Sequence, residues 1–181
     1  MTALEHEIIP ALEAKYPLGQ GRRLVMGASL GGLNAYLAWN RLPYLFAKAA
    51  FQCPAFFSHN PITDAQTRRT IAERMSASDQ GTRRYRRSVD FHIESLKILA
   101  WAFEKDVTAA DDWAQFDPAA AANDGVPRAP AYVVSSRDDQ FKFSTGHELS
   151  GVGRTVLFEQ VDDTHCVGVN TVGLARFLVR H

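Results

Sequence analysis

Apolar and polar positions follow one another along the chain in the pattern of short strands separated by helices. Apolar runs of strand length lie at residues 22–27, 47–53, 130–136 and 154–161. Apolar side chains recur at helical spacing in residues 2–16, where Pro10 predicts a kink, and in residues 29–40 and 171–180. Strands that alternate with helices form a parallel sheet with right-handed crossovers. The pattern therefore predicts an α/β fold with a mainly parallel sheet of about four strands flanked by helices.

The pattern changes between residues 57 and 124. Two helical segments are expected there, at about 64–75 and 83–105, and the second has a broad apolar face. The strand-and-helix order resumes only after this stretch. We therefore expect one domain over residues 1–181, with residues 57–124 as a helical, lid-like insertion within it.

One stretch, residues 23–35, combines an apolar strand, a Gly-x-Ser-x-Gly motif centred on Ser29 and the small-residue start of a helix. A nucleophile elbow requires this context, because its turn is too sharp for bulky flanking side chains. Gly27 and Gly31 meet that need, and Gly32 keeps the helix close to the sheet. The backbone N–H of Leu30 is then the first candidate donor to an oxyanion. The alternative is a turn that only packs or binds phosphate, although the dinucleotide and Walker spacings are absent.

Candidates for an acid and a base follow the last two predicted strands. Asp138 comes after the strand at 130–136, and His165 after the strand at 154–161. Groups at the carboxyl ends of parallel strands gather at one edge of the sheet. The order serine, acid, histidine is that of α/β-hydrolases. Asp139 is the alternative acid, whereas Asp162 and Asp163 are too near His165 in sequence to share the required direction.

Composition and charge exclude several classes of partner. The 181 residues are 46% hydrophobic and 22% charged, as in ordinary globular domains. Lys and Arg balance Asp and Glu at 20 each, so no net charge attracts nucleic acid or an anionic membrane. The Arg-rich cluster at residues 83–87 is interpreted as a solvated helix start.

The cellular location of the protein and the state of its cysteines are predicted from features that the sequence lacks. No apolar run approaches the ~20 residues of a membrane span, and no signal-peptide pattern opens the chain. The two cysteines, Cys53 and Cys166, make no disulfide framework and lack metal-ligand spacing. We expect Cys166 to be an inert packing residue. The expectation is a cytoplasmic protein without a bound metal.

Residues 6–57 resemble the putative esterase family of α/β-hydrolases, which includes enterochelin esterases and S-formylglutathione hydrolase. The resemblance rests on Lys-Tyr-Pro at the end of the first helix, the elbow stretch and the Leu-Pro-Tyr-Leu-Phe run at 42–46. Leu30 stands where the family usually has Met. The resemblance implies hydrolysis of a carboxylic ester or thioester without a cofactor. It assigns the nucleophile to Ser29, the acid to Asp138 and the histidine to His165.

The chain departs from the family at its start. Family members carry, before the first helix, the segment that supplies half of the sheet and the loop with the second oxyanion donor. We therefore expect a partial α/β-hydrolase fold whose elbow strand has an unpaired edge. Truncation, dimerisation through that edge and replacement by the insertion are the three explanations. We expect at least a homodimer.

Two further functions stay open beside ester hydrolysis. The first is a weak or inactive α/β-hydrolase fold that binds a ligand or a partner. The second is acyl transfer to an acceptor other than water. The substrate is expected to be a small ester, and Phe57 and Phe141 are the candidates for its pocket. The sequence does not identify its acyl or leaving group.

Overall fold

The structure is a computed structural model that describes residues 3–16, 23–56, 65–103, 118, 125–137, 149, 156–162, 166 and 171–179, without the side chains of 98–103. Within these residues, four strands form one sheet in the order β1-β2-β3-β4. All three strand pairs are parallel. The strands are β1 (Leu24–Ala28), β2 (Lys48–Gln52), β3 (Ala131–Ser136) and β4 (Val156–Val161). The predicted parallel α/β sheet is thus confirmed.

The helices lie close to where the apolar spacing places them. They are α1 (Ile9–Lys15), α2 (Leu30–Arg41), α3 (Ala65–Met75), α4 (Tyr85–Phe103) and α6 (Thr171–Val179), with a short 3-10 turn at Ala77–Asp79. A π-helical turn, Leu4–Ile8, precedes α1. Pro10 lacks an N–H and crowds the preceding turn, so the predicted irregularity takes the form of this wider turn.

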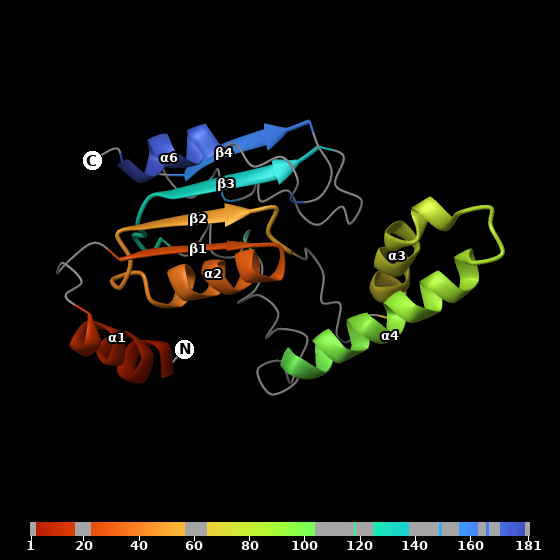
Figure 1. Ribbon diagram of the computed structural model, residues 1–181, viewed down its shortest axis with the longest axis horizontal. Coiled ribbons are helices and arrows are strands. Elements are labelled where there is room, and N and C mark those ends of the chain that lie inside the picture. The colour runs from red at the N-terminus through yellow and green to blue at the C-terminus, as the bar shows by residue number, and fades with distance from the viewer. Residues whose placement is uncertain are drawn as a thin grey trace.

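Two helices cover opposite faces of the sheet, because successive side chains of a strand point to opposite faces. Ala49, Phe51 and Val133 belong to the main core together with α2 residues. Their neighbours Ala50, Tyr132 and Val134 pack instead against Phe177 of α6. Figure 1 shows the strands running side by side, with α2 next to β1 and α6 next to β4.

The core beneath α2 is rich in aromatic side chains. Tyr36 and Phe56 meet edge to face at 5.1 Å between ring centroids, and Trp39 and Phe51 do so at 5.6 Å. The indole N–H of Trp39 donates to the carbonyl of Ala129 at 2.9 Å. This hydrogen bond joins α2 to the segment that enters β3. The main core therefore joins α2 to β2 and β3 as one unit.

Helices α3 and α4 form a hairpin with a small core of its own. Ile71 and Ala72 of α3 are buried against Val89 and Leu96 of α4. The hairpin lies beyond the arrowheads of the strands in Figure 1, on the side of their carboxyl ends. The Arg residues of the 83–87 cluster are exposed at the start of α4, as expected for a solvated helix start. That residues 57–124 act as a lid stays a prediction.

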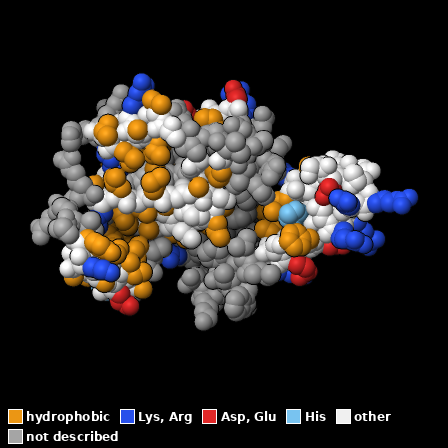
Figure 2. Space-filling view, viewed as in Figure 1, with side chains coloured by type: hydrophobic (Ala, Val, Ile, Leu, Met, Phe, Trp, Pro, Cys, Tyr) orange, Lys and Arg blue, Asp and Glu red, His pale blue; other side chains and the backbone are white. Residues whose placement is uncertain are grey.

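Strand β1 lies at the edge of the described sheet and is the most exposed of the strands. The side chains of Leu24 and Met26 are 48% and 59% exposed. Helix α1 approaches this side through a hydrogen bond from Tyr44 to Glu5 and an ion pair between Arg23 and Glu13. Figure 2 shows apolar side chains gathered over the part of the molecule that holds the sheet and α1. Within the described residues, β1 pairs with β2 alone.

Candidate active site

Ser29 occupies the single residue between the end of β1 and the start of α2. Its backbone has φ 53° and ψ −122°, a conformation that L-residues rarely adopt. Such strain persists only where the surrounding structure over-determines it. The N–H of Ser29 donates to the carbonyl of Gln52 at 3.0 Å, and its own carbonyl accepts from Ala55 at 2.9 Å. The end of β2 and the segment after it therefore hold the turn that the Gly-x-Ser-x-Gly motif predicts.

The glycines around Ser29 have different steric roles. A Cβ on Gly27 would lie 2.0 Å from the carbonyl oxygen of Gly31, so only glycine fits there. A Cβ on Gly32 would lie 2.9 Å from the Cα of Pro54, which confirms the close approach of α2 to the strand ends. The expectation for Gly31 is wrong. Its Cβ would meet no described atom within 4 Å, because Gly31 lies on the exposed side of the first turn of α2.

Leu30 is the first residue of α2, which is 12 residues long. The first N–H groups of a helix have no partner within the helix, and the helix dipole adds positive potential there. A developing oxyanion near the Ser29 side chain would thus meet unpaired backbone donors. Leu30 directly follows Ser29 at the start of α2, and its role as the first oxyanion donor stays a prediction.

The acid and base candidates follow the strand ends, but Asp138, Asp139 and His165 lie outside the described residues, as do Phe57 and Phe141. The segments that lead to them lie side by side. The N–H of Arg137, after β3, donates to the carbonyl of Val161 at the end of β4 at 2.8 Å. The Arg137 guanidinium also contacts the Asp162 carboxylate at 3.0 Å, with both side chains largely exposed. Asp162 therefore forms an ion pair with Arg137 at the surface.

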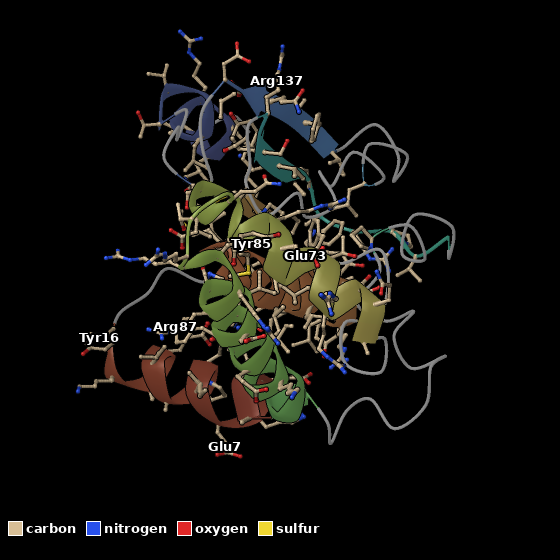
Figure 3. The ribbon with its side chains drawn as sticks, turned by 90° about the vertical axis from the view of Figure 1, so that its right-hand side faces the viewer. Glu7, Tyr16, Glu73, Tyr85, Arg87 and Arg137 are labelled. Carbon is tan, nitrogen blue, oxygen red and sulfur yellow. A yellow bond between two sulfur atoms is a disulfide. The ribbon has the colours of Figure 1, made fainter. Side chains whose placement is uncertain are left out.

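The two cysteines form a disulfide, which corrects the expectation of an inert, packing Cys166. Their Cα atoms are 5.4 Å apart, in the usual range for a disulfide. Cys53 follows β2 and Cys166 follows β4, so the sheet, whose parallel strands end at one edge, brings together two cysteines that no local sequence pattern connects. Figure 3 looks onto this edge and draws the disulfide as a yellow bond behind the hairpin. Disulfides are typical of oxidising compartments and rare in the cytosol, so the bond does not support the cytoplasmic location, which stays a prediction.

A second link joins the same two segments and was not predicted either. The side-chain amide of Gln52 donates to the carbonyl of Cys166 at 3.3 Å. Gln52 also accepts the N–H of Ser29, so it contacts both the elbow and the segment after β4. No hydrophobic pattern marks such a residue, since its role depends on strands brought together by folding.

The described residues hold no group of three His, Cys, Asp or Glu side chains placed to bind a metal ion. No helix in the described part of the chain has the length and apolar character to cross a membrane.

The fold is similar to those of solved esterases. An esterase from Pyrococcus furiosus matches with a TM-score of 0.57 at 12% identity, over 93% of this chain and 55% of that one. An S-formylglutathione hydrolase from Agrobacterium tumefaciens matches with a TM-score of 0.54 at 14% identity, over 98% and 53%. The chain thus spans about half the length of these proteins. At such identities the likeness shows the fold, a partial α/β-hydrolase.

The sequence comparisons give the family. No curated protein shows significant similarity to the sequence. The family model described as putative esterase matches residues 1–142, a range that includes the elbow, the hairpin and the first three strands. The strained serine between β1 and α2 lies within that match. The chain belongs to the putative esterase family.

Proposed function

We propose that this chain is a serine hydrolase that cleaves a carboxylic ester or thioester through an acyl-enzyme on Ser29. The observation that carries the proposal is the backbone of Ser29, strained at φ 53° between a strand end and a helix start. A turn that only packs does not require such strain, whereas a nucleophile elbow uses it to expose the serine oxygen. Membership of the esterase family supports the same activity.

The proposed reaction uses three side chains. Ser29 Oγ attacks the acyl carbon while His165 takes its proton, and Asp138 orients the imidazole. The oxyanion accepts a hydrogen bond from the N–H of Leu30. Collapse expels the alcohol or thiol, which receives the proton from His165. Water then attacks the acyl-enzyme with the same histidine as base and releases the acid.

The surroundings of this site are part of the proposal. Residues 57–124 act as a lid-like insertion, and the position of α3 and α4 beyond the carboxyl ends of the strands supports this. Phe57 follows the buried Phe56 in sequence, and Phe141 follows the acid by three positions, so both lie on segments that leave the sheet at the proposed site. We propose that they contact the acyl group.

Labelling with a fluorophosphonate probe tests the nucleophile. We expect the native chain to bind the probe covalently, and Ser29→Ala and His165→Ala to lose labelling. In serine proteases, which also form an acyl-enzyme, removal of the serine nucleophile lowers kcat by roughly 10⁶-fold. The matched control is Ser95→Ala, a half-buried serine of α4 whose hydroxyl donates to the carbonyl of Phe91 at 3.0 Å, and it should label normally. A folded native chain that does not label would favour the alternative function, an inactive fold that binds a ligand or partner.

We further propose that two copies of the chain associate through β1. An edge strand with exposed Leu24 and Met26 is a template for pairing, and no other described strand covers it. Sedimentation at micromolar concentration should give a dimer. Met26→Lys places a charge on the edge and should shift the chain to monomer, while Leu157→Lys, at an exposed position of β4, should not. A native chain that sediments only as monomer contradicts the dimer.

A further inference from the structure

Backbone strain is concentrated at one place in the described part of the chain. Three non-glycine residues there have positive φ, namely Ser29 at 53°, Cys53 at 36° and Cys166 at 58°. All three lie where β1, β2 and β4 end or just beyond. Strain of this kind clusters at functional sites, where neighbouring contacts hold it in place. The two cysteines therefore share a positive φ with the proposed nucleophile.

The contacts between these residues form a continuous connection. Ser29 donates its N–H to Gln52, and Gln52 is bonded covalently to Cys53. Cys53 is fixed in turn by a hydrogen bond from its N–H to the carbonyl of Val134 at 2.6 Å. The disulfide then crosses from Cys53 to Cys166, and the Gln52 amide reaches the carbonyl of the same Cys166. Cys166 is thus attached twice to the strand end that holds the elbow.

Cys166 directly follows His165 in the sequence. Consecutive Cα atoms are ~3.8 Å apart, so a bond that fixes Cys166 restricts the position of its neighbour. We propose that the Cys53–Cys166 disulfide positions the segment that carries His165 against the nucleophile elbow. This inference rests on the proposed function, in which His165 takes the proton of Ser29. Cys53 and Cys166 are positioning residues, because neither needs to touch the substrate.

The disulfide should affect the rate of the chemical step more than substrate binding. A displacement of about 1 Å in a reacting group can lower the rate roughly 100-fold. Without the bond, Cys166 loses its covalent link to the residue after β2 and keeps the weaker hydrogen bond from the Gln52 amide. We therefore expect loss of the disulfide to lower kcat by about 10- to 100-fold and to leave KM nearly unchanged.

The experiment compares oxidised and reduced native chain with p-nitrophenyl acetate as substrate and a fluorophosphonate as the probe of Ser29. A trialkylphosphine reduces the disulfide to two thiols and takes one oxygen atom from water, and the reagent is removed before the assay. Oxidised glutathione restores the bond and leaves as two molecules of reduced glutathione. Thiol alkylation and mass spectrometry measure the state of Cys53 and Cys166. Circular dichroism measures the folded fraction, so that rates are given per folded molecule.

We expect reduction to lower kcat and the labelling rate by at least 10-fold, and reoxidation to restore both. The double variant Cys53→Ala/Cys166→Ala should show the low rate and no response to phosphine. A bond with a merely structural role would change the folded fraction and not kcat per folded molecule. If the double variant does not fold, the reduced native chain below its unfolding temperature supplies the same measurement.

Two results overturn the inference while the proposed function stands. One is Ser29-dependent labelling at equal rates in the oxidised and reduced chain. The other is a labelling-competent chain whose two thiols stay open to alkylation after treatment with oxidised glutathione. If the oxidised, folded chain shows no labelling that depends on Ser29, the proposed function itself fails, and this inference fails with it.

Discussion

The core beneath α2 is rich in aromatic side chains and joins distant segments, whereas the buried residues of the α3–α4 hairpin core are aliphatic and close in sequence. The main core joins α2 to β2 and β3 and also includes Phe56 and Leu149. The hairpin core draws only on neighbouring turns of α3 and α4. Both hold buried aliphatic residues. Only the main core adjoins the strained turn at Ser29.

This difference explains where the site can be placed. The strained backbone of Ser29 requires rigidly packed surroundings. The main core provides them through the parallel strands and the packing of Gly32 on Pro54. The hairpin is closed on itself, so its helices can vary without moving the strand ends. Its surface carries many of the Lys and Arg side chains visible in Figure 2, as expected for a solvated element. The residue proposed as the nucleophile is thus held by the main core and not by that of the hairpin.

The largest expected effect comes from a methyl group at the elbow. Gly27→Ala places a Cβ 2.0 Å from the carbonyl oxygen of Gly31, so β1 and α2 must separate. We expect a loss of at least ~3 kcal/mol in the free energy of unfolding, the upper end of overpacking costs, together with loss of fluorophosphonate labelling. The matched control is Gly31→Ala, whose Cβ meets no described atom and whose helix gains from the replacement of glycine. Equal effects of the two substitutions would contradict this account of the turn.

A matched pair of leucines tests whether the two cores are separate. Leu33 in α2 is 1% exposed and Leu96 in α4 is 6% exposed. Each Leu→Ala change should cost about 2–5 kcal/mol where it acts. Hydrogen exchange should rise throughout the sheet for Leu33→Ala, but only in α3 and α4 for Leu96→Ala. Faster exchange of β2 and β3 in Leu96→Ala would mean that the hairpin and the sheet unfold as one unit.

The smallest effect concerns the face of the sheet that α6 covers. Burial raises the pKa of Tyr132, and its hydrogen bond to Glu159 and the charge of that carboxylate raise it further. A raised pKa in the folded state means that stability is complete below the unfolded pKa of about 10 and is lost as pH rises above it. Thermal unfolding between pH 9 and pH 11, about one unit on either side of the unfolded pKa, should therefore show a loss of stability with rising pH. Tyr132→Phe should reduce this loss.

The control for this prediction is Tyr16→Phe, because Tyr16 is exposed at the end of α1. It should keep the alkaline decrease of the native chain. The main core does not take part, since Tyr132 stacks on Phe177 at 5.6 Å on the opposite face. An unchanged decrease in Tyr132→Phe would assign the alkaline loss to another group.

The periodicity of the sequence determined the elements, their order and the parallel sheet. Local patterns carry this information, because strands and helices each impose a fixed spacing on their apolar residues. The Gly-x-Ser-x-Gly motif likewise placed the turn at Ser29, since the steric demand on Gly27 is local. The family resemblance added the expected acid at Asp138 and base at His165, which lie outside the described residues.

The tertiary structure alone decided which residues contact one another where the strands end. The motif marked Gly31 as a glycine that the sharp turn requires, yet the direction of α2 leaves it on the outside. Cys53 and Cys166 are 113 positions apart, and no local pattern reports that folding brings them together. The same holds for Gln52, whose two contacts come from the elbow and from the segment after β4. Contacts between distant segments depend on the register and direction of whole strands, which a short stretch of sequence does not encode.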